Sequence, residues 1–141
     1  MQIINPTNGE KLEKHGSCFL DCFGNVFPIV NGVLRIVLHE NYTENFGYQW
    51  NKFAKTQLDS REVGNDISRR RLFAETLWHK QDLSGQNLLE VGSGAGRFSR
   101  VILENTNANL YSVDYSDAVT ANYKNNGQIA PDRFYLLQAS I

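Results

Sequence analysis

Residues 88–97 read LLEVGSGAGR, and this stretch decides which fold is expected for the chain. A short apolar run ends here in three glycines spaced Gly-x-Gly-x-Gly, and apolar side chains at helical spacing follow Arg97. Glycines at a strand-to-helix turn let the backbone bend sharply and approach a ligand closely, while the helix N-terminus offers free N–H groups to an anion. The stretch predicts a nucleotide- or small-anion-binding turn between a buried strand and a helix.

The segments around this turn alternate between strand and helix patterns. We expect helices between three short strands, and one amphipathic helix before them over residues 66–79. Ser116 is expected to cap the second intervening helix and Gly127 to end it. Such alternation is typical of right-handed crossovers, so we expect an α/β fold: a Rossmann-like, doubly wound parallel sheet, incomplete, with its first three strands present. The predicted strands are residues 87–91, 110–113 and 134–138.

Composition divides the chain into three parts. Residues 1–40 hold turn signals and short β-rich runs, including a hairpin around residues 31–32, and are expected to form a small β-rich module. Residues 41–82 combine an aromatic, amide-rich arm with the amphipathic helix, and residues 83–141 carry the alternating strands and helices. The first part has too few apolar residues to fold alone, so we expect it to pack on the remainder or to use a metal.

Charge, cysteine content and apolar length disfavour several classes of protein. The 141 residues include 14 Lys and Arg against 15 Asp and Glu, and a net charge of -1 disfavours binding of nucleic acid through a global basic field. Two cysteines are too few for a disulfide scaffold. Because the N-terminus lacks a signal peptide pattern and no apolar run could cross a bilayer, we expect a cytoplasmic protein with reduced thiols.

Two acidic residues complete the predicted binding turn. Asp114 follows the next predicted strand, about 20 residues after the loop, where a carboxylate can accept hydrogen bonds from both ribose hydroxyls. Glu90 ends a buried strand, where a carboxylate needs donors that the loop N–H groups or a ligand amine could supply. Arg97 stands where a dinucleotide-binding loop carries its third glycine, so the spacing disfavours NAD and flavins.

Residues 88–96 followed by residues 113–116 (Val-Asp-Tyr-Ser) resemble the class I S-adenosylmethionine-dependent methyltransferases, particularly their small-molecule branch. The resemblance covers residues 87–141 and implies S-adenosyl-L-methionine as the cofactor. It implies that Asp114 binds the ribose and that Tyr115 packs against the adenine. Ser140 stands where the family often has an acidic residue for the adenine amino group. The other cofactor-binding residues expected are Glu90, Gly92, Ser93, Gly94 and Gly96.

The N-terminal parts carry resemblances of their own. Residues 1–40 are similar to a zinc-ribbon-like domain found beside or fused to methyltransferases, with Asn5 and Asn8 where a zinc-binding version has cysteines. The other candidate ligands lack a second matching pair, so we expect no bound metal. Residues 46–59 resemble an arm that closes the pocket in some of these enzymes, and one arginine of residues 69–71 could reach the cofactor carboxylate. The candidate metal ligands are His15, Cys18, Cys22 and His39.

These observations predict a methyltransferase that transfers the methyl group of S-adenosyl-L-methionine to a small-molecule acceptor, with no catalytic base assigned. A complete fold of the resembled family has more strands than the three found here, so we expect the N-terminal part of a longer enzyme, inactive alone. One alternative is a non-catalytic, oligomeric or partner-completed nucleotide-binding module, and another is a zinc-stabilised binding module. The first predicted strand would leave an unpaired sheet edge, which permits pairing with a second copy.

Overall fold

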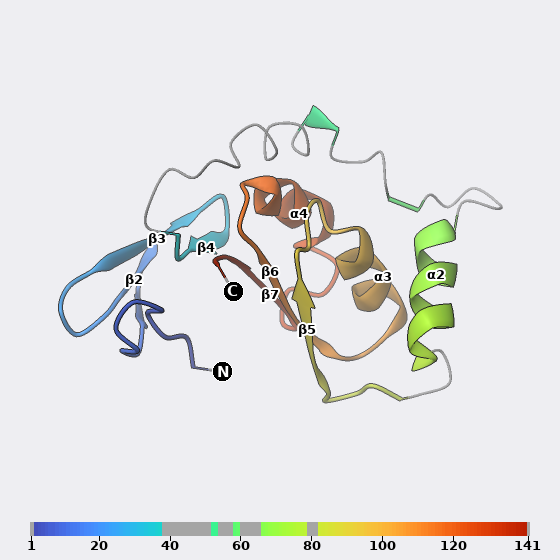
Figure 1. The fold of residues 1–141 in the computed structure, drawn as a ribbon, viewed down its shortest axis with the longest axis horizontal. Coiled ribbons are helices and arrows are strands. Elements are labelled where there is room, and N and C mark those ends of the chain that lie inside the picture. The colour runs from blue at the N-terminus through green and yellow to red at the C-terminus, as the bar shows by residue number, and fades with distance from the viewer. Residues whose placement is uncertain (1, 38–51, 54–57, 60–65, 79–81, 141) are drawn as a thin grey trace.

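The computed structural model describes residues 2–37, 52–53, 58–59, 66–78 and 82–140. Within these ranges the chain forms seven strands and three helices (Figure 1). None of the helices in this part of the chain has the length and hydropathy needed to cross a bilayer. The elements are β1 (Glu13–His15), β2 (Cys18–Leu20), β3 (Val26–Val30), β4 (Val33–Arg35), α2 (Ile67–Thr76), β5 (Asn87–Val91), α3 (Arg97–Asn105), β6 (Asn109–Asp114), α4 (Ala118–Asn126) and β7 (Phe134–Gln138).

The seven described strands join in one sheet in the order β1-β2-β3-β4-β7-β6-β5. The pairs β5–β6 and β6–β7 are parallel, so that Leu89 lies opposite Tyr111 and Tyr111 lies opposite Tyr135. These three strands follow the apolar runs that predicted them, and the helices α3 and α4 form the crossovers between them. The mixed α/β architecture is confirmed, and it is consistent with a Rossmann-like sheet.

Strand β4 joins the N-terminal module to the parallel sheet. It pairs antiparallel with β3 through the predicted turn, where Asn31 and Gly32 have φ of 51° and 82°, as a two-residue hairpin requires. On its other side β4 runs parallel to β7, with Leu34 opposite Leu137 and Arg35 opposite Gln138. The module therefore continues the same sheet, whereas its sequence indicated only that it packs against the remainder.

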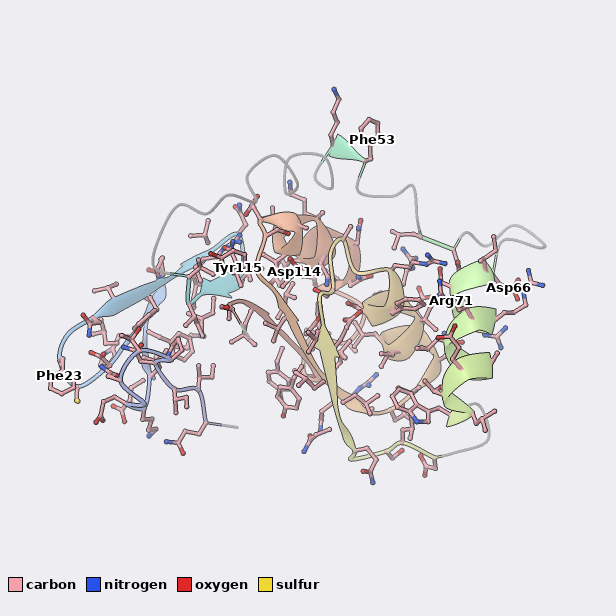
Figure 2. The ribbon with its side chains drawn as sticks, viewed as in Figure 1. Phe23, Phe53, Asp66, Arg71, Asp114 and Tyr115 are labelled. Carbon is pink, nitrogen blue, oxygen red and sulfur yellow. The ribbon has the colours of Figure 1, made fainter. Side chains whose placement is uncertain are left out.

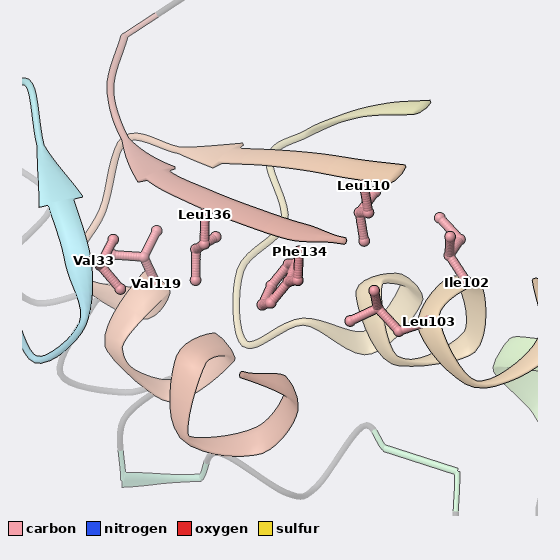
Figure 3. Close-up of a cluster of buried hydrophobic side chains, with 7 residues drawn as sticks. All are labelled: Val33, Ile102, Leu103, Leu110, Val119, Phe134 and Leu136. Atoms are coloured by element: carbon pink, nitrogen blue, oxygen red, sulfur yellow. The ribbon is translucent and has the colours of Figure 1, made fainter. Parts of the chain in front are cut away.

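Two buried clusters form the core. The larger lies between the sheet and the helices α3 and α4 (Figure 3), and Val33 of the N-terminal module belongs to it. The smaller holds the module together around Phe27. Burial of each large apolar side chain contributes about 1.5–3 kcal/mol, so the shared core fastens the module to the sheet. The larger cluster consists of Val33, Ile102, Leu103, Leu110, Val119, Phe134 and Leu136, and the smaller of Leu12, Phe27, Leu34 and Ile36.

The described helices cover only one face of the parallel strands. Helices α3 and α4 contact β6 there, and α2 packs on the outer side of α3 (Figure 1). On the opposite face of β5, Leu89 and Val91 are 69% and 54% exposed, and next to them Tyr111 and Tyr135 stack with ring centroids 4.7 Å apart. Because a parallel sheet is usually covered on both faces, this apolar surface is unusual. We call it the open face.

The N-terminus of α2 is capped by a residue outside the helix. Asp66 occupies the predicted N-cap position, but its side chain makes no capping hydrogen bond. Instead Asp59 accepts hydrogen bonds from the backbone N–H groups of Ser68 and Arg69, at 2.9 and 2.8 Å. The helix begins where expected and ends at Thr76, earlier than the apolar spacing predicts, because Leu77 adopts a left-handed conformation.

Candidate functional site

The glycine loop connects β5 to α3, as predicted. Gly92, Gly94 and Gly96 have φ of 72°, 51° and 86°, a conformation that L-residues rarely adopt. A Cβ atom added to Gly92 or Gly94 would meet no atom within 4 Å, whereas one added to Gly96 would lie 2.1 Å from Asn122 Oδ1. The first two glycines therefore face open space, and the third packs against α4.

Asparagines of α4 hold the packed side of this loop. Asn125 Nδ2 donates to the carbonyl of Ala95 at 3.0 Å, and Asn126 Nδ2 donates to the carbonyl of Gly96 at 2.9 Å. The sequence reasoning missed this support. The pattern that could have indicated this support is the pair Asn122 and Asn126, which are four residues apart and lie on one face of α4. Both side chains are fully buried.

Asp114 lies at the end of β6 and contacts the loop directly (Figure 2). Its Oδ2 atom accepts a hydrogen bond from the N–H of Gly94 at 2.7 Å. Its Oδ1 atom accepts from the N–H and the hydroxyl of Ser116, at 2.8 and 2.7 Å. The structure thus brings together the two features that the sequence separates by 20 residues, the glycine loop and the acidic strand end.

Glu90 is half-buried beside α3, where its Oε2 atom accepts hydrogen bonds from the hydroxyls of Ser99 and Ser112, at 2.5 and 2.7 Å. Burial raises the pKa of Glu90, and the two serine hydrogen bonds offset part of that rise. The loop N–H groups were expected as donors, but the structure supplies these serines instead. Ser99 comes from α3 and Ser112 from β6, so the carboxylate links three elements of the sheet and helix layers.

Three further residues from the sequence prediction lie at or near this edge of the sheet. Ser93 is buried, with 7% of its surface exposed, and its hydroxyl has no hydrogen-bond partner among the described residues. Tyr115 follows β6 and Ser140 follows β7, and both residues are exposed. A buried hydroxyl without a partner is unfavourable unless a ligand or water satisfies it. Ser93 is therefore a polar group of the glycine loop for which the described residues supply no hydrogen-bond partner.

The arginines considered for a cofactor carboxylate make other contacts. Arg70 pairs with Asp66 at 2.8 Å and Arg71 with Glu75 at 3.0 Å, both one turn apart on α2. Arg69 donates to a side-chain oxygen of α3, Asn105 Oδ1. In the structure these three side chains are therefore engaged away from the glycine loop.

No three His, Cys, Asp or Glu residues gather into a metal-binding group within the described ranges. Cys18 and Cys22 are free thiols, and Cys18 donates to the carbonyl of His15 at 3.3 Å. His39 and most of the aromatic arm, including Tyr48 and Trp50, lie outside the described residues.

In the N-terminal module, the side chains of three asparagines surround the carboxylate of Asp21. Asp21 Oδ2 accepts hydrogen bonds from the side-chain amides of Asn5, Asn8 and Asn25, at 2.9, 3.0 and 2.7 Å. Asp21 Oδ1 accepts from the backbone N–H groups of Phe23 and Asn25. Burial alone would raise the pKa of Asp21, but the amide hydrogen bonds, led by Asn25, hold it well below the usual range. We call Asn5, Asn8, Asp21 and Asn25 the Asp21 cluster.

A large cavity of about 1100 Å³ lies away from the glycine loop, between α2 and α3. Its arginines already have protein partners, since Arg100 pairs with Glu104 and Arg69 donates to the amide oxygen of Asn105. Its floor is apolar, with Leu103 and Ile129. We therefore place the candidate site at the glycine loop, where an open backbone and a buried unpaired hydroxyl occur together.

The similarity of this chain to known proteins is a similarity of fold. No protein-family model and no curated protein matches the sequence. A solved protein of Methanococcus maripaludis, provisionally assigned as an S-adenosyl-L-methionine-dependent methyltransferase, aligns with a TM-score of 0.51 and 15% identity over 74% of this chain and 45% of its own. Phosphoethanolamine N-methyltransferase 1 of Haemonchus contortus was solved with phosphoethanolamine and S-adenosylhomocysteine. It aligns with a TM-score of 0.42 and 17% identity over 68% of this chain and 21% of its own. The chain therefore shares the fold of the first protein and spans less than half its length.

Proposed function

We propose that the protein binds S-adenosyl-L-methionine at the glycine loop and is a methyltransferase that acts on a small-molecule acceptor. The observation that carries this proposal is the contact between the N–H of Gly94 and the carboxylate of Asp114, beside a loop whose glycines Gly92 and Gly94 face open space. An acidic strand end next to such a loop is the arrangement that binds the ribose of a nucleotide in open α/β sheets.

The residues present fit this cofactor. Asp114 has acceptor capacity beyond its bonds to Gly94 and Ser116, because each carboxylate oxygen has two lone pairs. The N-terminus of α3 favours an anionic group such as a carboxylate. The unpartnered hydroxyl of Ser93 and the exposed ring of Tyr115 are further contacts in this proposal. Together they offer polar groups for the ribose and the amino acid part and an apolar surface for the adenine.

The chemistry of this function depends mostly on positioning. When bound, S-adenosyl-L-methionine supplies a methyl group that its sulfonium makes electrophilic. The role of this chain is to hold the cofactor in one orientation. Asp114 binds the ribose, and the loop between Gly92 and Gly96 contacts the amino acid part of the cofactor. Correct alignment of two reactants is itself a large contribution to rate.

The test is calorimetric titration of the protein with S-adenosylhomocysteine and, separately, with NAD. We expect binding of the first, weakened by about 1–3 kcal/mol in Asp114→Ala through loss of charge-assisted hydrogen bonds. Asp132→Ala is the matched control, because Asp132 is an exposed carboxylate in the loop before β7. Affinity for NAD without affinity for S-adenosylhomocysteine would contradict the proposal.

The open face supports a second part of this proposal. We propose that the chain supplies the cofactor half of the enzyme, and that transfer requires more of the sheet than the four parallel strands β4, β7, β6 and β5. The alternative function, a non-catalytic nucleotide-binding module completed by another chain, is supported by the same surface. Methyl transfer by a longer chain distinguishes the two, because only the enzyme produces S-adenosylhomocysteine.

Strand β5 also offers an edge for self-association. Its other side is unpaired in the described sheet, and Leu89 and Val91 expose apolar side chains beside it. An open edge with exposed apolar side chains promotes pairing between chains. We expect light scattering coupled to chromatography to show a dimer or larger species, and Leu89→Lys to shift it toward monomer. A wild-type monomer at high concentration would contradict this expectation.

A further inference from the structure

Arg35 is a buried cation at the junction between the N-terminal module and the parallel sheet. Its side chain is 9% exposed, and it ends β4 opposite Gln138 of β7. Its Nη1 atom donates to Gln138 Oε1 at 2.7 Å and pairs with Asp117 Oδ1 at 3.0 Å. Its Nη2 atom donates to Thr120 Oγ1 at 2.7 Å. The guanidinium therefore bridges β7 and the start of α4.

The contact with Arg35 fixes the orientation of the Gln138 amide. A guanidinium has only donors, so the amide must turn its oxygen toward Arg35 and its nitrogen away. That nitrogen, Nε2, donates to the backbone carbonyl of Tyr115 at 3.0 Å. The Tyr115 carbonyl, an acceptor, favours the same orientation, so the contacts with Arg35 and Tyr115 reinforce each other and hold the Gln138 amide in one position.

Arg35 consequently holds the segment of residues 114–117 at two points. It contacts Asp117 directly, and it contacts Tyr115 through Gln138. The same segment carries Asp114, whose backbone carbonyl accepts from the N–H of Ala139 at 3.1 Å. The segment lies between β6 and α4, next to the glycine loop (Figure 2).

We infer that Arg35 is a positioning residue for the adenosine side of the cofactor site, because through Gln138 and Asp117 it fixes the segment that presents Asp114 and Tyr115. For its ligand this inference rests on the proposed function. It gives the N-terminal module a role in the site, since the module supplies the arginine through β4 and the parallel pairing with β7.

Two variants separate positioning from general stabilisation. Arg35→Met removes the guanidinium and keeps a side chain of similar length. Gln138→Glu keeps an acceptor for Arg35 but removes the donor to the Tyr115 carbonyl. It therefore breaks the connection from Arg35 to Tyr115 and keeps the contact between Arg35 and β7. Arg133→Met is the control, because Arg133 is a partly buried arginine that donates to the backbone carbonyls of Ala108 and Leu103, at the opposite end of the strands.

Two measurements are made on each purified protein. Hydrogen exchange in the absence of ligand reports the N–H of Ser116, which Asp114 protects, and we expect Arg35→Met and Gln138→Glu to exchange on the order of tenfold faster there. Calorimetric titration with S-adenosylhomocysteine should show affinity reduced by about three- to tenfold in both variants. Arg133→Met should leave both values unchanged.

The outcomes separate this inference from the proposed function. If the wild type does not bind S-adenosylhomocysteine, the proposed function fails, and the exchange rates alone decide whether Arg35 orders the segment. Wild-type exchange and affinity in Gln138→Glu would overturn the positioning role, even if Arg35→Met unfolds. Equal losses in Arg133→Met would overturn it too, because the effect would then follow from stability.

Discussion

Asp21 and Asp114 both accept hydrogen bonds at turns, but they differ in how many protein donors occupy their carboxylate oxygens. Asp21 is 6% exposed and accepts from three side-chain amides and two backbone N–H groups of the described residues. Asp114 accepts from one N–H of the glycine loop and from the two donors of Ser116, and open space lies above the neighbouring Gly94.

This difference separates a structural carboxylate from a candidate ligand-binding one. The acceptors of Asp21 are used by the two turns that it joins, so the Asp21 cluster stabilises the N-terminal module. Asp114 combines a few protein donors with an open backbone beside it, which leaves acceptor capacity for a ligand hydroxyl. Substitutions in the two regions should therefore affect different measurements.

The largest effect is expected for Asp21→Ala, which leaves the amides of Asn5, Asn8 and Asn25 without their shared acceptor. We expect the module to lose its fixed tertiary structure, seen as the lowest unfolding temperature of the variants and a reduced near-UV circular dichroism signal. Because the pKa of Asp21 is lowered on folding, its contribution is present above the ordinary value of 3.8 and lost as the pH falls below it.

Glu13→Ala is the control for this variant, because Glu13 is an exposed carboxylate of the same module that pairs with Lys11. An exposed pair of this kind contributes little to stability, so its unfolding temperature should match the wild type. If Asp21→Ala unfolds at the wild-type temperature, the Asp21 cluster does not hold the module together.

The next largest effect is expected for two glycine variants of the loop. Gly94→Val should abolish binding of S-adenosylhomocysteine and keep the far-UV circular dichroism signal, since the side chain enters open space at a cost in backbone strain of roughly 1–2 kcal/mol. Gly96→Val should instead destabilise the fold, because its Cβ would displace Asn122 and Asn126. Unchanged affinity in folded Gly94→Val would show that the loop is only a turn.

The strands and the glycine loop could be predicted because their signals are local. The apolar run of β7 predicted its bounds, and the turn at Asn31-Gly32 predicted the β3–β4 hairpin. The pairing of β4 with β7 could not be predicted, since Arg35 and Gln138 are 103 residues apart and no local pattern specifies which distant edge a short strand joins.

In the candidate site too, contacts that depend on local sequence patterns could be predicted, and contacts between distant segments could not. Asp114 and Gly94 could be expected together because a strand end beside a glycine loop places them so in any parallel crossover. The serine donors of Glu90 could not, because a buried carboxylate reveals a need for donors and not their identity. Likewise the sequence pointed to Asn5 and Asn8, but their shared contact with Asp21 depends on two turns meeting in space.

The smallest effect on stability is expected for substitution of Glu90. Its contribution to stability changes with pH in the opposite direction to that of Asp21. Burial raises the pKa of Glu90 on folding, so ionisation opposes the folded state. Stability is therefore lost as the pH rises from the ordinary pKa of 4.5 toward the raised value, whereas the contribution of Asp21 is lost as the pH falls.

Glu90→Gln should remove this dependence and keep the side chain's size and its contact with the serine hydroxyls, so we expect a gain of about 1 kcal/mol or less at neutral pH. The free energy of unfolding, measured by urea denaturation between pH 4 and pH 8, should decline less with pH in the variant than in the wild type. Glu104→Gln is the control, because Glu104 is an exposed residue of α3 paired with Arg100, and it should leave the pH dependence unchanged. If Glu90→Gln and wild type have the same pH dependence, Glu90 is ionised in the folded protein at no net cost and its serine donors balance its burial, whereas the amides of Asn5, Asn8 and Asn25 outweigh the burial of Asp21.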